Sequence, residues 1–147
     1  MSVWLSSPTA AGLRVLSLML GVFLIFMSVD KIDWLMDGTI LTRRLQQWHA
    51  SAPPMSRWYL EAVAIPGAVL FARLVPLAEL AAGAALVTGV RVPLAATLSL
   101  LMVLNFHFAS DVLLHYSYLS NAYGPPVLGG LLALAIGGRR LPFSLSR

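Results

Sequence analysis

Apolar residues are gathered into four long runs, separated by segments that hold most of the polar side chains. The runs cover about residues 13–29, 66–90, 93–112 and 117–136. A helix that crosses a bilayer needs about 20 predominantly apolar residues. The fourth run is the weakest, because its uninterrupted part, Val127–Ile136, is short, and the run must include Gly124-Pro125-Pro126 as a kink or a first turn. The pattern predicts an all-α, integral membrane four-helix bundle that forms a single domain.

The longest connection, from about Asp30 to Ile65, carries a helical pattern of its own. Within residues 39–50, four apolar positions share one side: Ile40, Leu41, Leu45 and Trp48. This pattern is typical of an amphipathic helix that lies flat in the headgroup region of a membrane. We expect a second short helix over Met55–Ala64, with Trp58 and Tyr59 as interfacial aromatic residues.

Composition supports a membrane location and removes several classes of function. The chain has 147 residues, of which 59% are hydrophobic and 11% are charged, whereas ordinary soluble domains carry about 25% charged residues. The net charge of +4 does not indicate nucleic acid as a partner, because the arginines lie between apolar runs, where they report topology. The chain has no cysteine, which excludes disulfides, thiolate metal sites and dithiol redox chemistry.

Four spans place both termini on one side of the membrane. Apart from Arg73 within the second span, the lysines and arginines divide five to four between the two sides, and the terminal side holds Arg14, Arg91, Arg139, Arg140 and Arg147. The positive-inside rule counts these cations. We therefore expect a multi-pass protein of the cell inner (plasma) membrane with both termini in the cytoplasm.

Ionisable residues within the spans indicate where a site lies, because such groups are costly in a bilayer and usually face a partner or a cavity. Packing the second span against the third, with the turn near Arg91, places Glu79 level with about Val103 and Arg73 level with about Ala109. We expect a polar cluster at the non-cytoplasmic end of the bundle, with Glu79 as its deepest member. Its predicted members are Lys31, Arg73, Glu79, Asn105, His107, Asp111 and Asn121.

This cluster has two interpretations. In the structural one, Arg73 and Asp111 form an ion pair and Glu79 bonds to Asn105, as polar residues often do between membrane helices. In the functional one, the cluster is a pocket for a quinone headgroup, an anion or a proton path. Glu79 then exchanges protons, and Arg73 or Lys31 stabilises developing negative charge. The remaining members, His107, Asn105, Asp111 and Asn121, contact the bound group.

His107, Asp111 and His115 recur at a spacing of four and share one helix face. The outer two lie about 12 Å apart along a helix axis, so the three together cannot bind one metal ion. Binding of a metal by His107 and Asp111 with a third ligand from elsewhere stays open, as does axial ligation of a pigment by His107. No resident metal is predicted.

Three segments resemble the DoxX/DoxD-like family of small four-helix membrane proteins. They are Phe26–Lys31, Leu77–Arg91, and Leu119–Gly124 followed by Gly137-Gly138-Arg139. The resemblance covers about Gly12 to Phe143 and highlights Lys31, Glu79 and Asn121. The long first loop is similar to the DoxD branch, which is linked to thiosulfate:quinone oxidoreductase.

The resemblance implies a quinone-linked subunit of a membrane redox system, without a metal or flavin of its own. Partner membrane subunits would then supply the redox centre. The alternative is a non-catalytic accessory subunit of a larger respiratory or photosynthetic complex, which the absence of any evident electron carrier favours. A transporter is disfavoured because the chain shows no inverted repeat.

Overall fold

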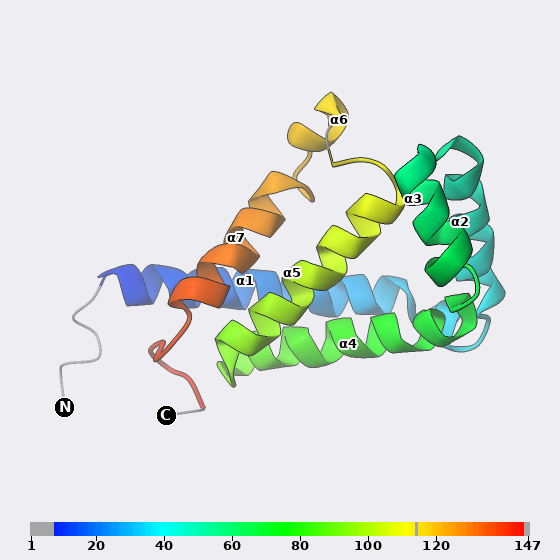
Figure 1. The fold of residues 1–147 in the computed structure, drawn as a ribbon. Helices are drawn as coiled ribbons and strands as arrows, with labels where there is room; N and C mark the ends of the chain where they lie inside the picture. Colours follow the sequence, from blue (N-terminus) through cyan, green and yellow to red (C-terminus); the bar gives the residue numbers. More distant parts are fainter. Residues whose placement is uncertain (1–7, 114, 146–147) are drawn as a thin grey trace.

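The computed structural model describes residues 8–113 and 115–145, and its regular structure in these ranges is entirely helical (Figure 1). Two of the short elements are not α-helical: η1 is a 3₁₀ turn and η2 is a π-helical turn. In chain order the elements are α1 (Pro8–Asp30), η1 (Ile32–Leu35), α2 (Thr39–Ser51), α3 (Pro54–Tyr59), η2 (Leu60–Ala64), α4 (Ala68–Thr88), α5 (Val92–Ala109), α6 (Tyr116–Leu119) and α7 (Pro125–Gly137).

Three helices, α1, α4 and α5, are long and apolar enough to cross a membrane. They coincide within a few residues with the first three predicted spans, which are thereby confirmed as helices. Each of them also turns large apolar side chains outward, for example Phe26, Leu70 and Leu98, which are 68%, 58% and 57% exposed. Such extensive exposed apolar surface suits contact with lipid, so the chain is a membrane protein by its helices as well as by its composition.

The fourth predicted span is wrong in its first half. Residues 117–136 do not form one helix, because the chain makes the separate single turn α6 and begins α7 only at Pro125. Pro125 and Pro126 lack amide protons and therefore suit the first turn of a helix rather than its interior. With 13 residues, α7 is about 20 Å long, which is shorter than a bilayer core is thick.

The close antiparallel pair of α1 and α4 forms the base of the molecule, and α5 and α7 pack together across it (Figure 1). Two glycines make the contact between α1 and α4 possible. A Cβ atom on Gly21 would lie 2.9 Å from the carbonyl oxygen of Gly83, and one on Gly83 would lie 2.8 Å from that of Gly21. The absence of a side chain at Gly83 thus permits the close contact of the two helices. Gly130 likewise packs against Leu20.

Arg14 is buried and forms hydrogen bonds to the C-terminal end of α4. Its guanidinium donates hydrogen bonds to the carbonyl oxygens of Leu86 (3.0 Å), Val87 (2.6 Å) and Phe143 (3.2 Å). The hydroxyl of Ser17 also donates to the Leu86 carbonyl, over 2.7 Å. The last carbonyls of a helix lack partners within it and carry partial negative charge. Arg14 therefore has a structural role in addition to its place in the charge count.

Replacing Arg14 by Met is expected to lower the free energy of unfolding by about 2 kcal/mol, because hydrogen bonds from a charged donor to buried carbonyls are lost. Reversible unfolding in mixed micelles, followed by tryptophan fluorescence, measures the change. Arg73→Met is the control, since Arg73 is exposed and makes no hydrogen bond or ion pair with a described residue. Equal stabilities of the two variants would contradict the assignment.

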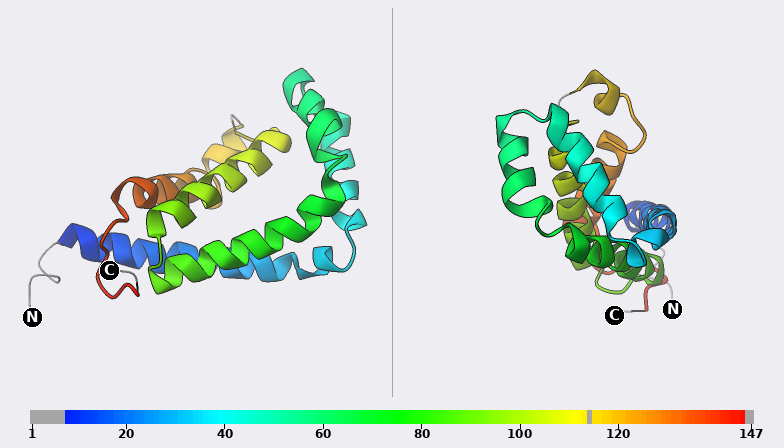
Figure 2. Two further views of the ribbon diagram at one scale, coloured as in Figure 1. Left: turned by 60° about the horizontal axis from the view of Figure 1, so that its bottom comes forward. Right: turned by 90° about the vertical axis from the view of Figure 1, so that its right-hand side faces the viewer.

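At the opposite end, α2 and α3 lie across the ends of α1 and α4 (Figure 2). The predicted amphipathic helix over 39–50 is confirmed as α2, and the second short helix as α3 and η2. However, the apolar face of α2 is covered by protein: Leu41 and Leu45 are buried in one cluster with Ala68, Ala72 and Val75 of α4. The amphipathic pattern therefore reflects packing within the chain.

The start of α2 is held by Asp37. Its carboxylate accepts hydrogen bonds from the hydroxyl and the backbone amide of Thr39, over 2.6 and 2.9 Å. These hydrogen bonds hold the pKa of Asp37 below its ordinary value. The side chain thus closes an Asx turn directly before α2, which fixes where the loop after α1 turns into α2.

Candidate functional site

A buried ion pair joins α1 to α4. Lys31 Nζ donates to both carboxylate oxygens of Glu79, at 2.9 Å each, and to the carbonyl oxygen of Met27, also at 2.9 Å. The two side chains are only 9% and 7% exposed. All three ammonium protons of Lys31 thus have acceptors, whereas Glu79 retains lone pairs for a further donor.

The local chain places this pair at the end of α1. Lys31 directly follows the last residue of α1, and its amide nitrogen still donates to the carbonyl oxygen of Ser28. The hydroxyl of Ser28 donates over 2.7 Å to the carbonyl oxygen of Pro76, three residues before Glu79. These contacts fix the level and rotation of α1 against α4, so that the lysine meets the carboxylate.

The pair lies at the wall of a cavity of about 210 Å³. His107, from the last turn of α5, lines the same cavity, and Arg44 of α2 lines it as well. Lys31, Glu79 and His107 are therefore three predicted site residues that the structure brings to one cavity. Val103, which the depth comparison placed level with Glu79, also lines it.

Five aromatic side chains form much of the rest of the cavity wall: Phe23, Trp34, Trp48, Phe106 and Tyr123. Trp48 meets Phe106 edge to face, with ring centroids 6.3 Å apart. Phe23 and Tyr123 stack at 5.8 Å. The guanidinium of Arg44 and the ammonium of Lys31 lie 5.6 and 5.9 Å from the Trp34 ring. The cavity therefore combines flat apolar surfaces with cations that contact one of the rings.

His107 is coupled to the segment that follows α5. The hydroxyl of Tyr118, in α6, lies 3.0 Å from His107 Nδ1, and the two rings meet at 4.9 Å. A tyrosine hydroxyl is protonated at neutral pH and can donate, and burial raises the pKa of Tyr118 further. In the tautomer that accepts this bond on Nδ1, the proton resides on Nε2, and His107 is itself a donor.

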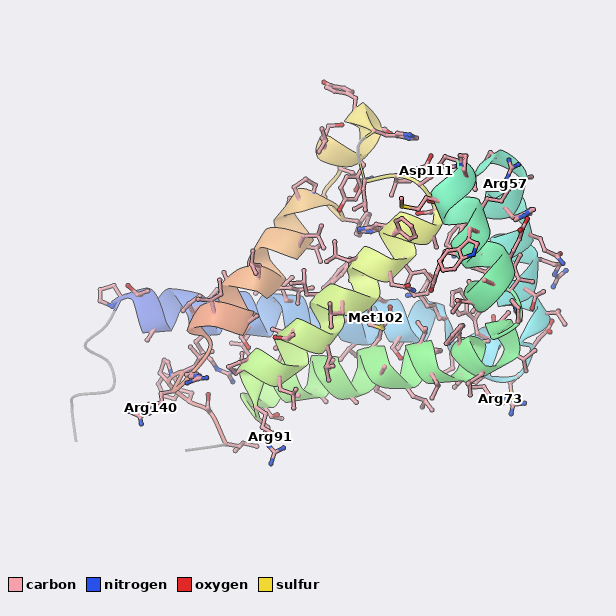
Figure 3. All side chains as sticks on the ribbon, in the orientation of Figure 1. Arg57, Arg73, Arg91, Met102, Asp111 and Arg140 are labelled. Atoms are coloured by element: carbon pink, nitrogen blue, oxygen red, sulfur yellow. The ribbon has the colours of Figure 1, made fainter. Side chains whose placement is uncertain are left out.

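The other predicted members of the polar cluster lie elsewhere. Arg73 is exposed and does not pair with Asp111, and the two residues lie on different sides of the molecule (Figure 3). Asp111 instead lies 3.9 Å from His115. Asn105 does not reach Glu79, because its side-chain oxygen accepts a 2.6 Å hydrogen bond from Tyr59 at a second cavity, of about 270 Å³. The Arg73–Asp111 and Glu79–Asn105 contacts were therefore wrong predictions.

Asn121 also stands apart from the cavity. It is exposed, and its side-chain oxygen accepts a hydrogen bond from the amide nitrogen of Tyr123 over 2.7 Å. This bond shapes the turn that leads to α7. Its nearest connection to the site is through Tyr123, whose ring lines the cavity.

The arrangement of His107, Asp111 and His115 on one helix face was also a wrong prediction. The helix α5 ends at Ala109, and Asp111 adopts a left-handed conformation with φ of 55°. Within residues 8–113 and 115–145, no group of three histidine, cysteine, aspartate or glutamate side chains is placed to hold a metal ion.

Sequence reasoning missed Arg44 and the aromatic walls. Trp48 was placed on the membrane face of an amphipathic helix, yet it lines the cavity together with the buried Trp34. One signal was available: α2 carries an arginine and a tryptophan four residues apart, which places both on one helix face. The position of Phe106 was a second signal, because it lies on α5 between the candidates Asn105 and His107.

Comparison with known proteins adds no relative, since no family model, no curated protein and no solved structure matches the chain.

Proposed function

We propose that this chain is a DoxX/DoxD-like membrane protein whose aromatic cavity binds the headgroup of a quinone, as a subunit of a membrane redox system. The observation that carries the proposal is the buried Lys31–Glu79 pair at the wall of an aromatic-lined cavity. A quinone headgroup is a flat ring with carbonyl oxygens that accept hydrogen bonds. Such a ligand needs aromatic surfaces beside it and donors at its edge.

The polar groups suit the protonation steps of quinone reduction, in which the ring gains two electrons and two protons. The charge of Lys31 stabilises the negative charge that develops on a ring oxygen, and Glu79 takes up a proton from water and passes it to that oxygen. His107 serves the second oxygen through Nε2, while Tyr118 holds its ring. The electrons come from a redox centre in a partner membrane subunit.

The proposed topology follows from the separation of charge between the two ends of the molecule. All six acidic residues belong to the cavity end or to the buried pair, and Arg91, Arg139 and Arg140 lie at the other end without an acid. We propose that this acid-free arginine end, with both termini, faces the cytoplasm. In this arrangement α7, although shorter than the bilayer core, packs on α5 as the fourth helix of the bundle in the inner membrane.

Quinone binding is tested by titrating the purified protein in detergent with a tail-less benzoquinone and recording quenching of tryptophan fluorescence. Trp48→Ala is expected to weaken binding about tenfold, because it removes one aromatic wall of the cavity. Trp58→Ala is the matched control: Trp58 is 65% exposed on α3 and lines none of the cavities described here.

The two variants separate the possible outcomes. Weakened binding in Trp48→Ala alone supports the cavity as the site, whereas equal affinities in both variants contradict it. If the native protein does not bind the headgroup, the quinone-linked role fails, and the accessory role in a larger complex becomes the better explanation.

A further inference from the structure

A groove of about 320 Å³ runs between α4 and α5. The α4 side of the groove is formed by alanines at a helical spacing: Ala78, Ala81, Ala82 and Ala85. Because alanine extends no further than Cβ, this face leaves space where larger side chains would fill the gap between the helices. The α5 side continues from Arg91 at one end to Met102 at the other.

Met102 connects this groove to the candidate site. Its side chain lines both the α4–α5 groove and the cavity that holds Lys31 and Glu79. It lies midway between Arg91 and Asp111 along the molecule (Figure 3). Met102 therefore stands between the two spaces, and because methionine is flexible and adapts to irregular gaps, a change of its rotamer would join them.

The groove is polar near Met102 and at Arg91, and apolar between them. Ser99 lines it three residues before Met102, is 1% exposed, and its hydroxyl has no hydrogen-bond partner among the described residues. A buried hydroxyl without a partner is costly, which points to an acceptor supplied by a ligand near the Met102 end. From there to Arg91 the groove follows α5 for about 16 Å past leucine and alanine side chains.

We infer that the α4–α5 groove holds the apolar tail of a long-chain quinone, with Met102 at the passage from headgroup to tail. This inference rests on the proposed function. The leucine and alanine side chains between Ser99 and the exposed Arg91 match the hydrocarbon of such a ligand, which carries its oxygen atoms at the other end.

The second cavity, of about 270 Å³, also touches Met102 but suits a tail less well. It is walled by Leu41 and Leu45 of α2, and the Tyr59–Asn105 hydrogen bond lies at it. A tail placed there would desolvate an amide instead of following apolar helices.

The test compares two quinones and two leucine substitutions on α4. Ala81 and Ala84 are both exposed, but Ala81 lines the groove and Ala84 does not. Binding of a tail-less benzoquinone and of the same headgroup with a polyisoprenoid tail is measured by tryptophan quenching in detergent. Ala81→Leu is expected to weaken binding of the long-tailed quinone about tenfold and that of the tail-less quinone less than about twofold. Ala84→Leu is expected to change neither.

Each result has one meaning. If Ala81→Leu leaves the long-tailed quinone unaffected, or weakens both quinones equally, the tail does not lie in the groove, although the headgroup site stands. If neither quinone binds to the native protein, the proposed function itself fails. Circular dichroism and thermal unfolding of each variant confirm that the helices remain folded.

Discussion

Replacing either Lys31 or Glu79 by Met is expected to lower the free energy of unfolding by about 3–5 kcal/mol, because each change leaves the other charge buried without its partner. Both side chains are less than a tenth exposed, so water compensates little. Reversible unfolding in mixed micelles, followed by tryptophan fluorescence, measures both variants. Single variants as stable as the native protein would show that the pair is not buried.

The double variant, with Met at both positions, is expected to be about as stable as the native protein, since apolar side chains of similar volume often replace a buried ion pair without loss. The double variant also tests the role of the pair in binding without a loss of stability. We expect it to fold and to lose tight binding of the quinone headgroup. If a folded double variant binds the headgroup with native affinity, the two charges do not belong to the binding site and the pair has a structural role only.

Replacing Gly83 by Ala is expected to destabilise the protein by about 3 kcal/mol, at the upper end of the usual cost of overpacking. The added Cβ would lie 2.8 Å from the carbonyl oxygen of Gly21 and 3.0 Å from the amide nitrogen of Ile25. Both neighbours are backbone atoms, so relief requires α1 and α4 to move apart along their whole contact. That movement would also stretch the Lys31–Glu79 pair.

Gly129→Ala is the matched control on α7, because a Cβ atom there meets nothing within 4 Å. It is expected to be neutral or to stabilise by about 0.5 kcal/mol through helix propensity. The same unfolding measurement applies to both glycines. Equal effects would mean that α1 and α4 do not approach closely at Gly83.

The sequence was sufficient to predict the helices but only part of the site. Length and hydropathy identify α1, α4 and α5 because each is nearly free of charge over a spanning length. Depth along the helices was also predictable, and it placed Glu79 and Val103 at one level, where both line the cavity. Depth does not give rotation about the helix axis, however. Arg73 is six residues from Glu79, which turns it about 120° away from the buried face.

The choice of helix neighbours caused the remaining errors. Comparing the second and third spans as a pair made Asn105 the natural partner of Glu79, but α4 packs most closely on α1. The glycines at positions 21 and 83 determine that preference, and their match across two helices is visible only once the helices are placed. The aromatic walls were missed because α2 packs its apolar face on α4, whereas its pattern alone equally fits a helix that faces lipid.

The contacts of Arg14 have a consequence for the synthesis of the protein. Arg14 is translated before every acceptor that it uses, and one of them, the carbonyl oxygen of Phe143, comes almost at the end of the chain. During insertion into the membrane the guanidinium must stay hydrated or bind lipid phosphate until that late segment arrives. A product truncated after α7 would keep the acceptors at Leu86 and Val87 but lack the one at Phe143.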